Sequence, residues 1–287
     1  MGRWAGLCIV IACGLLWSGV AVAGNLEREE FVIPSESAKN VNLGLRFGVG
    51  KLTVSTSDMA DFAKIEVDRD VEAVRETFDH SMSGSTLDVT LKSKPRGHGF
   101  KMDSDNNRWD MMLSTRFPTE ADLEVGACEA DIDLGGIPLT DLKFQIGAAE
   151  GKIDFSEPNP SRIRDMKIEA GASKLTLSGL ANARFDYMKF LGGAGKFEFD
   201  FRGEFKGESE AKLSVGLGSA DILLSDDAAV RIEAEEDNWF STIDIPRHKL
   251  ERIGKGVYES DDYKTSKDRL LLRLEVGMGK VSVRWKP

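Results

Sequence analysis

The sequence has few of the residues that build disulfide frameworks, metal centres and histidine-based active sites. Its 287 residues include three cysteines, three histidines and eight prolines. Two of the cysteines, Cys8 and Cys13, lie in an apolar N-terminal segment, so a processed chain keeps Cys128 alone and forms no internal disulfide. The low proline content argues against a proline-rich linker protein. A large hydrophobic core must therefore supply the stability of the fold.

The chain also has fewer positively than negatively charged residues. Lysine and arginine number 38 against 48 aspartates and glutamates, which gives a formal net charge of −10 and a pI near 5.0. Phosphate backbones and anionic lipid surfaces repel such a chain. We therefore expect no nucleic-acid partner.

Long hydrophobic runs are missing beyond Gly24. Arg3 precedes an apolar stretch, and Ala21-Val22-Ala23 has the form of a signal-peptidase site. We predict a signal peptide at residues 1–23 and export to the periplasm, the cell envelope or the surface. Two alternatives stay open: residues 4–23 could remain as a membrane anchor, or Cys13 could be a lipidation site. Membrane contact is expected only through an uncleaved segment.

Glycine, in contrast, is abundant and regularly placed. A pattern recurs seven times: apolar, any, apolar, Gly, any, small, any, apolar, any, apolar. The five central copies follow one another with a period of about 22 residues, which is typical of repeat architectures. Longer segments separate them from the first and the last copy. The anchoring glycines are Gly48, Gly126, Gly147, Gly171, Gly193, Gly216 and Gly277.

Each copy of the repeat predicts two strand segments joined at a corner. Leu123 and Val125 alternate with polar residues before the glycine, and Ala130 and Ile132 do so after it. Val125 and Ala130 are separated by an odd number of positions, so one straight strand would place them on opposite faces. The chain must therefore bend, and the glycine permits the bend.

These units predict an all-β fold, a single-stranded parallel β-solenoid of about 22-residue coils with β-rich caps and little helix. We divide the chain into the signal peptide, an N-terminal cap and first coil at 24–122 with a polar exposed loop at 92–108, a regular core at 123–230, and a C-terminal excursion with a final coil at 231–287. Within the excursion, residues 239–246 and 256–260 are expected to form a hairpin.

The candidate functional residues are few. Asp133, Asp154 and Asp200 occupy one outward column, and close carboxylates can cleave glycosidic bonds or bind a cation. Trp109, Trp239 and Phe240 are expected to be exposed aromatics, and the last two could contact a partner, although packing in the cap is favoured. Cys128 falls in a column of small residues, which favours a buried thiol. We predict no catalytic residue, cofactor or metal site.

The repeat from Val125-Gly126 to Val215-Gly216, the run at 259–263 (ESDDY) and the terminal segment 272–285 (LRLEVGMGKVSVRW) together resemble the toast-rack domain of LiaF-like cell-wall stress-response proteins, which is related to glycine-punctuated adhesins. The resemblance implies a non-enzymatic envelope protein that binds, scaffolds or senses stress, with an envelope protein or a cell-wall glycan as its partner. The alternatives are an adhesin-like surface protein and a carbohydrate-active enzyme that uses the aspartate column.

Overall fold

The computed structural model describes residues 26–96, 107–203, 205–235 and 239–286, and these residues form strands, turns and loops with no helix. The predicted all-β class is confirmed. The predicted signal peptide lies outside the described residues. The strands are β1 (Leu26–Ile33), β2 (Asn40–Ser57), β3 (Ala63–Asp70), β4 (Val74–Ser83), β5 (Thr86–Pro95), β6 (Asn107–Ser114), β7 (Thr119–Asp133), β8 (Leu139–Ile146), β9 (Glu150–Asp154), β10 (Ile163–Ser178), β11 (Phe185–Asp200), β12 (Glu208–Ser225), β13 (Ala229–Ala234), β14 (Ser241–Asp244), β15 (Glu251–Gly254), β16 (Val257–Glu259) and β17 (Arg269–Lys286).

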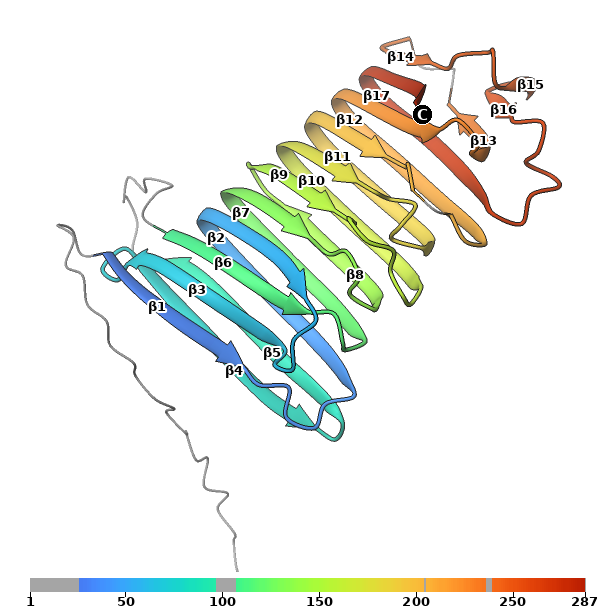
Figure 1. Cartoon of the computed structure of the whole chain (residues 1–287). Helices are drawn as coiled ribbons and strands as arrows, with labels where there is room; N and C mark the ends of the chain where they lie inside the picture. The colour runs from blue at the N-terminus through green and yellow to red at the C-terminus, as the bar shows by residue number, and fades with distance from the viewer. Residues whose placement is uncertain (1–25, 97–106, 204, 236–238, 287) are drawn as a thin grey trace, which may run out of the picture.

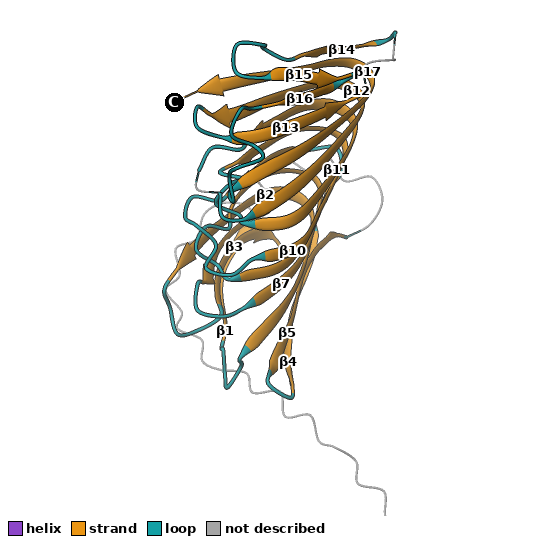
Figure 2. Cartoon of the chain, turned by 90° about the vertical axis from the view of Figure 1, so that its right-hand side faces the viewer, coloured by secondary structure: helices purple, strands orange, loops and turns teal. Residues whose placement is uncertain are grey.

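The long strands are bent into two arms. The first arm of β2 pairs with β5, whereas its second arm pairs with β6. In the same way, β8 and β9 pair with successive arms of both β7 and β10. The first arms together form one sheet and the second arms form another, which we call the first-arm sheet and the second-arm sheet. The bends line up along one edge of the molecule (Figure 1), and the connecting loops gather along the opposite side (Figure 2).

The pairing between neighbouring long strands is parallel and runs β2, β7, β8 with β9, β10, β11, β12 and β17. Its register follows the repeat in the sequence. Phe47, just before Gly48, lies opposite Val125, just before Gly126. Leu213 lies opposite Phe190, and each stands three positions before the corner glycine of its strand. Each strand is therefore displaced from its neighbour by the interval between their corner glycines.

The space between the two sheets holds the core, because alternate side chains of both arms point inward. The inward residues of the repeat are almost completely buried and form one hydrophobic cluster. Burial of each such side chain stabilises the fold by about 1.5–3 kcal/mol before conformational entropy is counted. One inward row consists of Leu123, Phe144, Ile168, Phe190, Leu213 and Leu274, and another consists of Ile132, Ile153, Leu177, Phe199, Ile222 and Val283.

The seven repeat glycines lie at the bends, but their role differs from the one expected. None of them has φ in the left-handed region. Each is favoured instead because a carbonyl group of the neighbouring strand lies close to the place that a side chain would take. A Cβ atom at Gly126 would lie 2.3 Å from the Gly48 oxygen, and one at Gly277 would lie 2.6 Å from the Gly216 oxygen. Left-handed φ occurs two positions later, at Gly50, Gly218 and Gly279.

The N-terminal cap contains two edge strands that the sequence pattern did not predict. β1 pairs antiparallel with β3 at the end of the second-arm sheet, and β4 pairs antiparallel with β5 at the end of the first-arm sheet. The expected exposure of Trp109 is wrong. Its indole is completely buried on the inner face of β6, where it lies against Phe47 and Phe78.

The polar loop predicted at 92–108 is shorter than expected. β5 continues to Pro95, and β6 begins at Asn107. Ser93 and Asn107 are buried, because the Asn107 amide donates hydrogen bonds to the Val49 carbonyl and the Ser93 hydroxyl. Residues 97–106 lie outside the described residues.

The hairpin expected in the C-terminal excursion is also wrong. β14 pairs parallel with β17, where it extends the second-arm sheet. β16 instead pairs antiparallel with β13 and with β15, so that β15 and β16 form the hairpin at the end of the first-arm sheet. The two segments thus cover the ends of different sheets.

Candidate functional site

The aspartate column lies on the outer face of the second-arm sheet, and Asp133 is directly opposite Asp154. Each carboxylate has a partner nearby. Asp133 accepts hydrogen bonds from the Ser156 hydroxyl (2.7 Å) and the Gly135 amide (2.9 Å). These contacts fix the turn after β7.

The other two aspartates, Asp154 and Asp200, form ion pairs with a lysine and an arginine close to them in the sequence. Lys152 Nζ lies 2.8 Å from Asp154. The Arg202 guanidinium contacts both oxygens of Asp200, with Nη2 at 2.7 Å from Oδ2 and Nε at 2.9 Å from Oδ1. The strand register thus aligns the three aspartates in one column, and the local contacts determine how each carboxylate is oriented.

Trp239 and Phe240 do not pack into the cap. Their exposed fractions are 98% and 72%, which are high values for large aromatic side chains. They directly precede β14, at the C-terminal end of the corner edge. Their exposure favours contact with another molecule over the packing role.

Cys128 lies at the corner of β7, opposite Gly50. It is half-buried, and burial raises the pKa of its thiol to about 11. The thiolate is the nucleophilic form of cysteine, so a thiol that stays protonated at neutral pH is a poor nucleophile.

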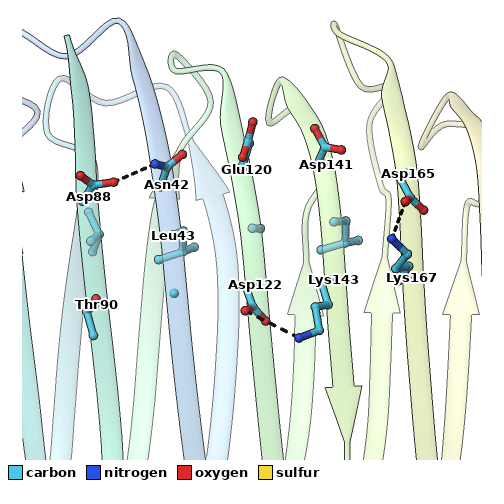
Figure 3. A pocket seen from close by; sticks show the side chains of 14 residues that line it. Asn42, Leu43, Asp88, Thr90, Glu120, Asp122, Asp141, Lys143, Asp165 and Lys167 are labelled. Atoms are coloured by element: carbon cyan, nitrogen blue, oxygen red, sulfur yellow. Dashed lines mark hydrogen bonds and ion pairs between the residues drawn. The ribbon is translucent and has the colours of Figure 1, made fainter. Parts of the chain in front are cut away.

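A hollow that the sequence analysis missed lies on the outer face of the first-arm sheet (Figure 3). It occupies about 440 Å³ and extends across β5, β2, β7, β8 and β10. Gly44 forms part of its floor, because it has no side chain where Thr90 and Asp122 have one on the neighbouring strands. A row of polar side chains borders it, namely Asp88, Asn42, Glu120, Asp141 and Asp165.

Most of the charges around this hollow are paired. The Asn42 amide donates to Asp88 at 2.7 Å, and Lys167 Nζ lies 2.6 Å from Asp165. The hydrogen bond and the charge of Asp165 raise the pKa of Lys167 above its usual value. Lys143 is farther from Asp122, at 4.0 Å, but Arg46 Nη2 lies 2.8 Å from the same carboxylate. Arg164 contacts both Asp141 and Glu120. With these two arginines counted, five carboxylates stand beside four cationic side chains, so the hollow carries only a small excess of negative charge.

One signal in the sequence could have located this hollow. Between Asn42 and Phe47 the apolar residues point inward and alternate with outward positions. Gly44 occupies one of the outward positions, away from any corner. The other lining residues come from β5, β7, β8 and β10, and they become neighbours only through the parallel register.

Among the described residues, no three histidine, cysteine or carboxylate side chains are grouped so that they could share a metal ion. In the same part of the chain, no helix has the length and apolar character that a membrane crossing requires.

Comparison with known families gives a match over more than half of the chain. The model described as the N-terminal domain of toast_rack matches residues 22–178. No curated protein matches the chain.

One solved structure shares the fold of this chain with a TM-score above 0.5. A structure from Clostridium sporogenes, described as a "putative cell adhesion protein", has 18% identity and a TM-score of 0.52, and the match covers 91% of this chain and 100% of that one. A second, described as a "putative adhesin" from Bacteroides fragilis, has 10% identity and a TM-score of 0.38, with coverage of 90% and 97%. At such identities the likeness concerns the fold alone.

Proposed function

Because the chain belongs to the toast-rack family, we propose that it is an exported, non-enzymatic binding module of the cell envelope, built as a short parallel β-solenoid with β-rich caps. The outer face of the first-arm sheet is its binding face. The similarity in fold to a structure described as a "putative cell adhesion protein" is consistent with a binding role.

The main support for this proposal is that Gly44 is a glycine although its position has room for a side chain. The neighbourhood would accept a side chain, because a Cβ atom there would meet nothing closer than the Val89 oxygen at 3.6 Å. Its φ is outside the left-handed region. A glycine inside a strand costs about 0.5–1 kcal/mol relative to alanine. Such glycines mark places where another molecule or backbone approaches closely.

The lining favours a polyhydroxylated ligand without strong negative charge. Carboxylate, amide and hydroxyl groups of Asp88, Asn42 and Thr90 can accept or donate hydrogen bonds to sugar hydroxyls. With five carboxylates beside four cationic side chains, the hollow offers no net positive charge that would attract a polyanion. A neutral or amine-bearing glycan of the envelope therefore suits the hollow better than a phosphate-rich polymer.

Filling the hollow tests the proposal. Gly44→Gln places a long side chain on its floor, and Thr53→Gln places the same side chain on the outer face of the second-arm sheet as a matched control. We expect Gly44→Gln to keep the fold, measured by circular dichroism and urea unfolding, and to lose binding to isolated cell-wall sacculi and to chitin oligosaccharides. Equal binding by both variants would refute the assignment of this face.

We propose no catalytic role for the aspartate column. The Asp133 and Asp200 carboxylates already accept hydrogen bonds that orient local turns. Replacing Asp133 and Asp154 with asparagine is therefore expected to leave glycan binding unchanged, which the same sacculus-binding measurement checks.

A further inference from the structure

A second hollow lies on the outer face of the first-arm sheet, next to the hollow over Gly44. It occupies about 610 Å³ and lies where the strands of this sheet begin, so we call it the strand-start hollow. Asn42 and Glu120 line both hollows, and they belong to the row of polar side chains labelled in Figure 3. The other polar residues that line the strand-start hollow are Asn40, Thr86, Thr140, Arg162 and Arg164.

The strand-start hollow coincides with a departure from the regular register. In β7 buried and outward residues alternate strictly from Thr119 to Val125. In β8 two successive residues, Thr140 and Asp141, stand between buried ones, and the register between β7 and β8 shifts at this point. An extra residue of this kind bends a strand and turns its side chains in a new direction, and such bulges are frequent next to active sites. The bulge thus places the Thr140 hydroxyl at the strand-start hollow.

The uncharged side chains of this lining are available for hydrogen bonds. Asn40 on β2 lies opposite Thr86 on β5, and within the described ranges neither side chain has a hydrogen-bond partner. The Asn42 amide nitrogen donates to Asp88, which leaves the Asn42 oxygen to accept. Amide and hydroxyl groups can both donate and accept, so they match the hydroxyl and acetamido groups of sugars.

The charged side chains of the strand-start hollow are engaged within the protein. Arg164 forms an ion pair with Asp141, and its Nη2 lies 3.7 Å from Glu120 Oε1. The Arg162 guanidinium pairs with Asp186 and donates to backbone carbonyl groups at the starts of β11 and β12. Because both guanidinium groups are used in this way, the hollow favours an uncharged ligand over an anion.

We propose that one neutral oligosaccharide chain occupies both hollows at the same time, an inference that rests on the glycan-binding function proposed above. Asn40 stands four residues before Gly44 on β2, and at about 3.3 Å per residue this separation is about 13 Å. That length exceeds a single pyranose ring, so a ligand that contacts both positions has several sugar units. Asn42 and Glu120, which line both hollows, contact its central part.

Calorimetric titration of the full chain with N-acetylglucosamine oligomers of two and six units tests the inference. We expect the six-unit oligomer to bind roughly tenfold more tightly than the two-unit oligomer, because it forms additional hydrogen bonds in the strand-start hollow. Asn40→Ala/Thr86→Val, and independently Thr140→Val, should lose most of this advantage and keep the affinity for two units. Thr176→Val, at a half-buried threonine on the outer face of the second-arm sheet, is the matched control and should leave both affinities unchanged.

The outcomes distinguish this inference from the proposed function. Equal affinity for the two lengths, or variants of the strand-start hollow that keep the full preference for six units, would overturn the inference and leave the proposed function intact. The same holds if these variants weaken both lengths equally, or if the protein binds cell-wall sacculi but neither oligomer. If Gly44→Gln binds sacculi and both oligomers as the unmodified protein does, or if the unmodified protein binds none of them, the proposed function itself fails.

Discussion

Arg69 on β3 and Glu76 on β4 form an ion pair between the two sheets, with 3.0 Å between Arg69 Nε and Glu76 Oε2. Both side chains are nearly buried, at 12% and 8% exposure. Phe31 on β1 and Phe78 on β4 stack beside this pair with ring centroids 4.1 Å apart. The N-terminal end of the core is thus closed by one polar and one aromatic contact between strands of opposite sheets.

Breaking this ion pair on one side should destabilise the protein strongly. Arg69→Met leaves the Glu76 carboxylate buried without its partner, which costs about 3–5 kcal/mol. The double variant Arg69→Met/Glu76→Leu removes both charges and should recover most of that loss. Urea unfolding of the single and double variants measures the difference, and equal stability of the two variants would contradict it.

The cost of Arg69→Met should depend on pH. Burial raises the pKa of Glu76 above its usual value, and Arg69 opposes that effect. A carboxyl group whose pKa is higher in the folded state destabilises the fold above that pKa, and this cost disappears as the pH falls through it. Without Arg69 the cost is larger. As the pH falls from neutral toward the usual carboxyl pKa of about 4.3, the free energy of unfolding of Arg69→Met should therefore approach that of the unmodified protein.

The corner glycines should resist even the smallest substitution. Gly126→Ala places a methyl group 2.3 Å from the Gly48 oxygen, so the backbone must shift. We expect a loss of roughly 1–3 kcal/mol, as for other overpacked sites. Gly44→Ala is the matched control, because its Cβ has room and alanine is favoured over glycine inside a strand. Thermal unfolding should lower the melting temperature of the first variant and leave that of the second unchanged or higher.

Gly192 and Phe197 should show coupled energetics. A Cβ atom at Gly192 would lie 2.7 Å from the rings of both Phe190 and Phe197, which pack edge to face with centroids 5.0 Å apart. Gly192→Ala should therefore destabilise the protein, and Phe197→Leu should relieve part of that penalty. A double-mutant cycle by urea unfolding measures the coupling. Strict additivity would show that the ring does not occupy the space left by the glycine.

Cys128 should react slowly in the folded protein. Because burial raises its pKa to about 11, only a small fraction is thiolate at mildly alkaline pH. We expect alkylation by iodoacetamide to be much faster in urea than in buffer, as mass spectrometry of Cys128 will reveal. Similar rates in both would show that the thiol is accessible and ionised.

The sequence predicts best where the pattern is periodic. The repeat around Leu123 and Phe144 has the spacing of the strand register, because each coil must place the same side chains against the same neighbours. Edge strands have no such constraint. β4 buries Val74 fully but Phe78 and Met82 only partly, so it lacks the alternation by which a strand is recognised. Its pairing with β5 therefore escaped prediction.

The candidate site was harder to predict than the fold. The hollow over Gly44 combines side chains from strands that are distant in the sequence, such as β2 and β7. The sequence alone could indicate Gly44 as an unusual outward glycine, but not which side chains surround it. The sequence also could not explain why glycine is needed at the corners. The carbonyl group that lies close to each corner glycine belongs to a different strand, so the local sequence pattern does not indicate it.

Because the register between neighbouring long strands is uniform, the length of the stack is set by the number of repeats. Ile163 lies opposite Phe185, so the segment 163–184 is one interchangeable increment. Losing or duplicating it would leave every remaining ladder aligned and would change the distance between the two caps by about 4.8 Å. Chains of this design can therefore lengthen or shorten in whole steps, while both capped ends, and whatever they hold, stay chemically the same.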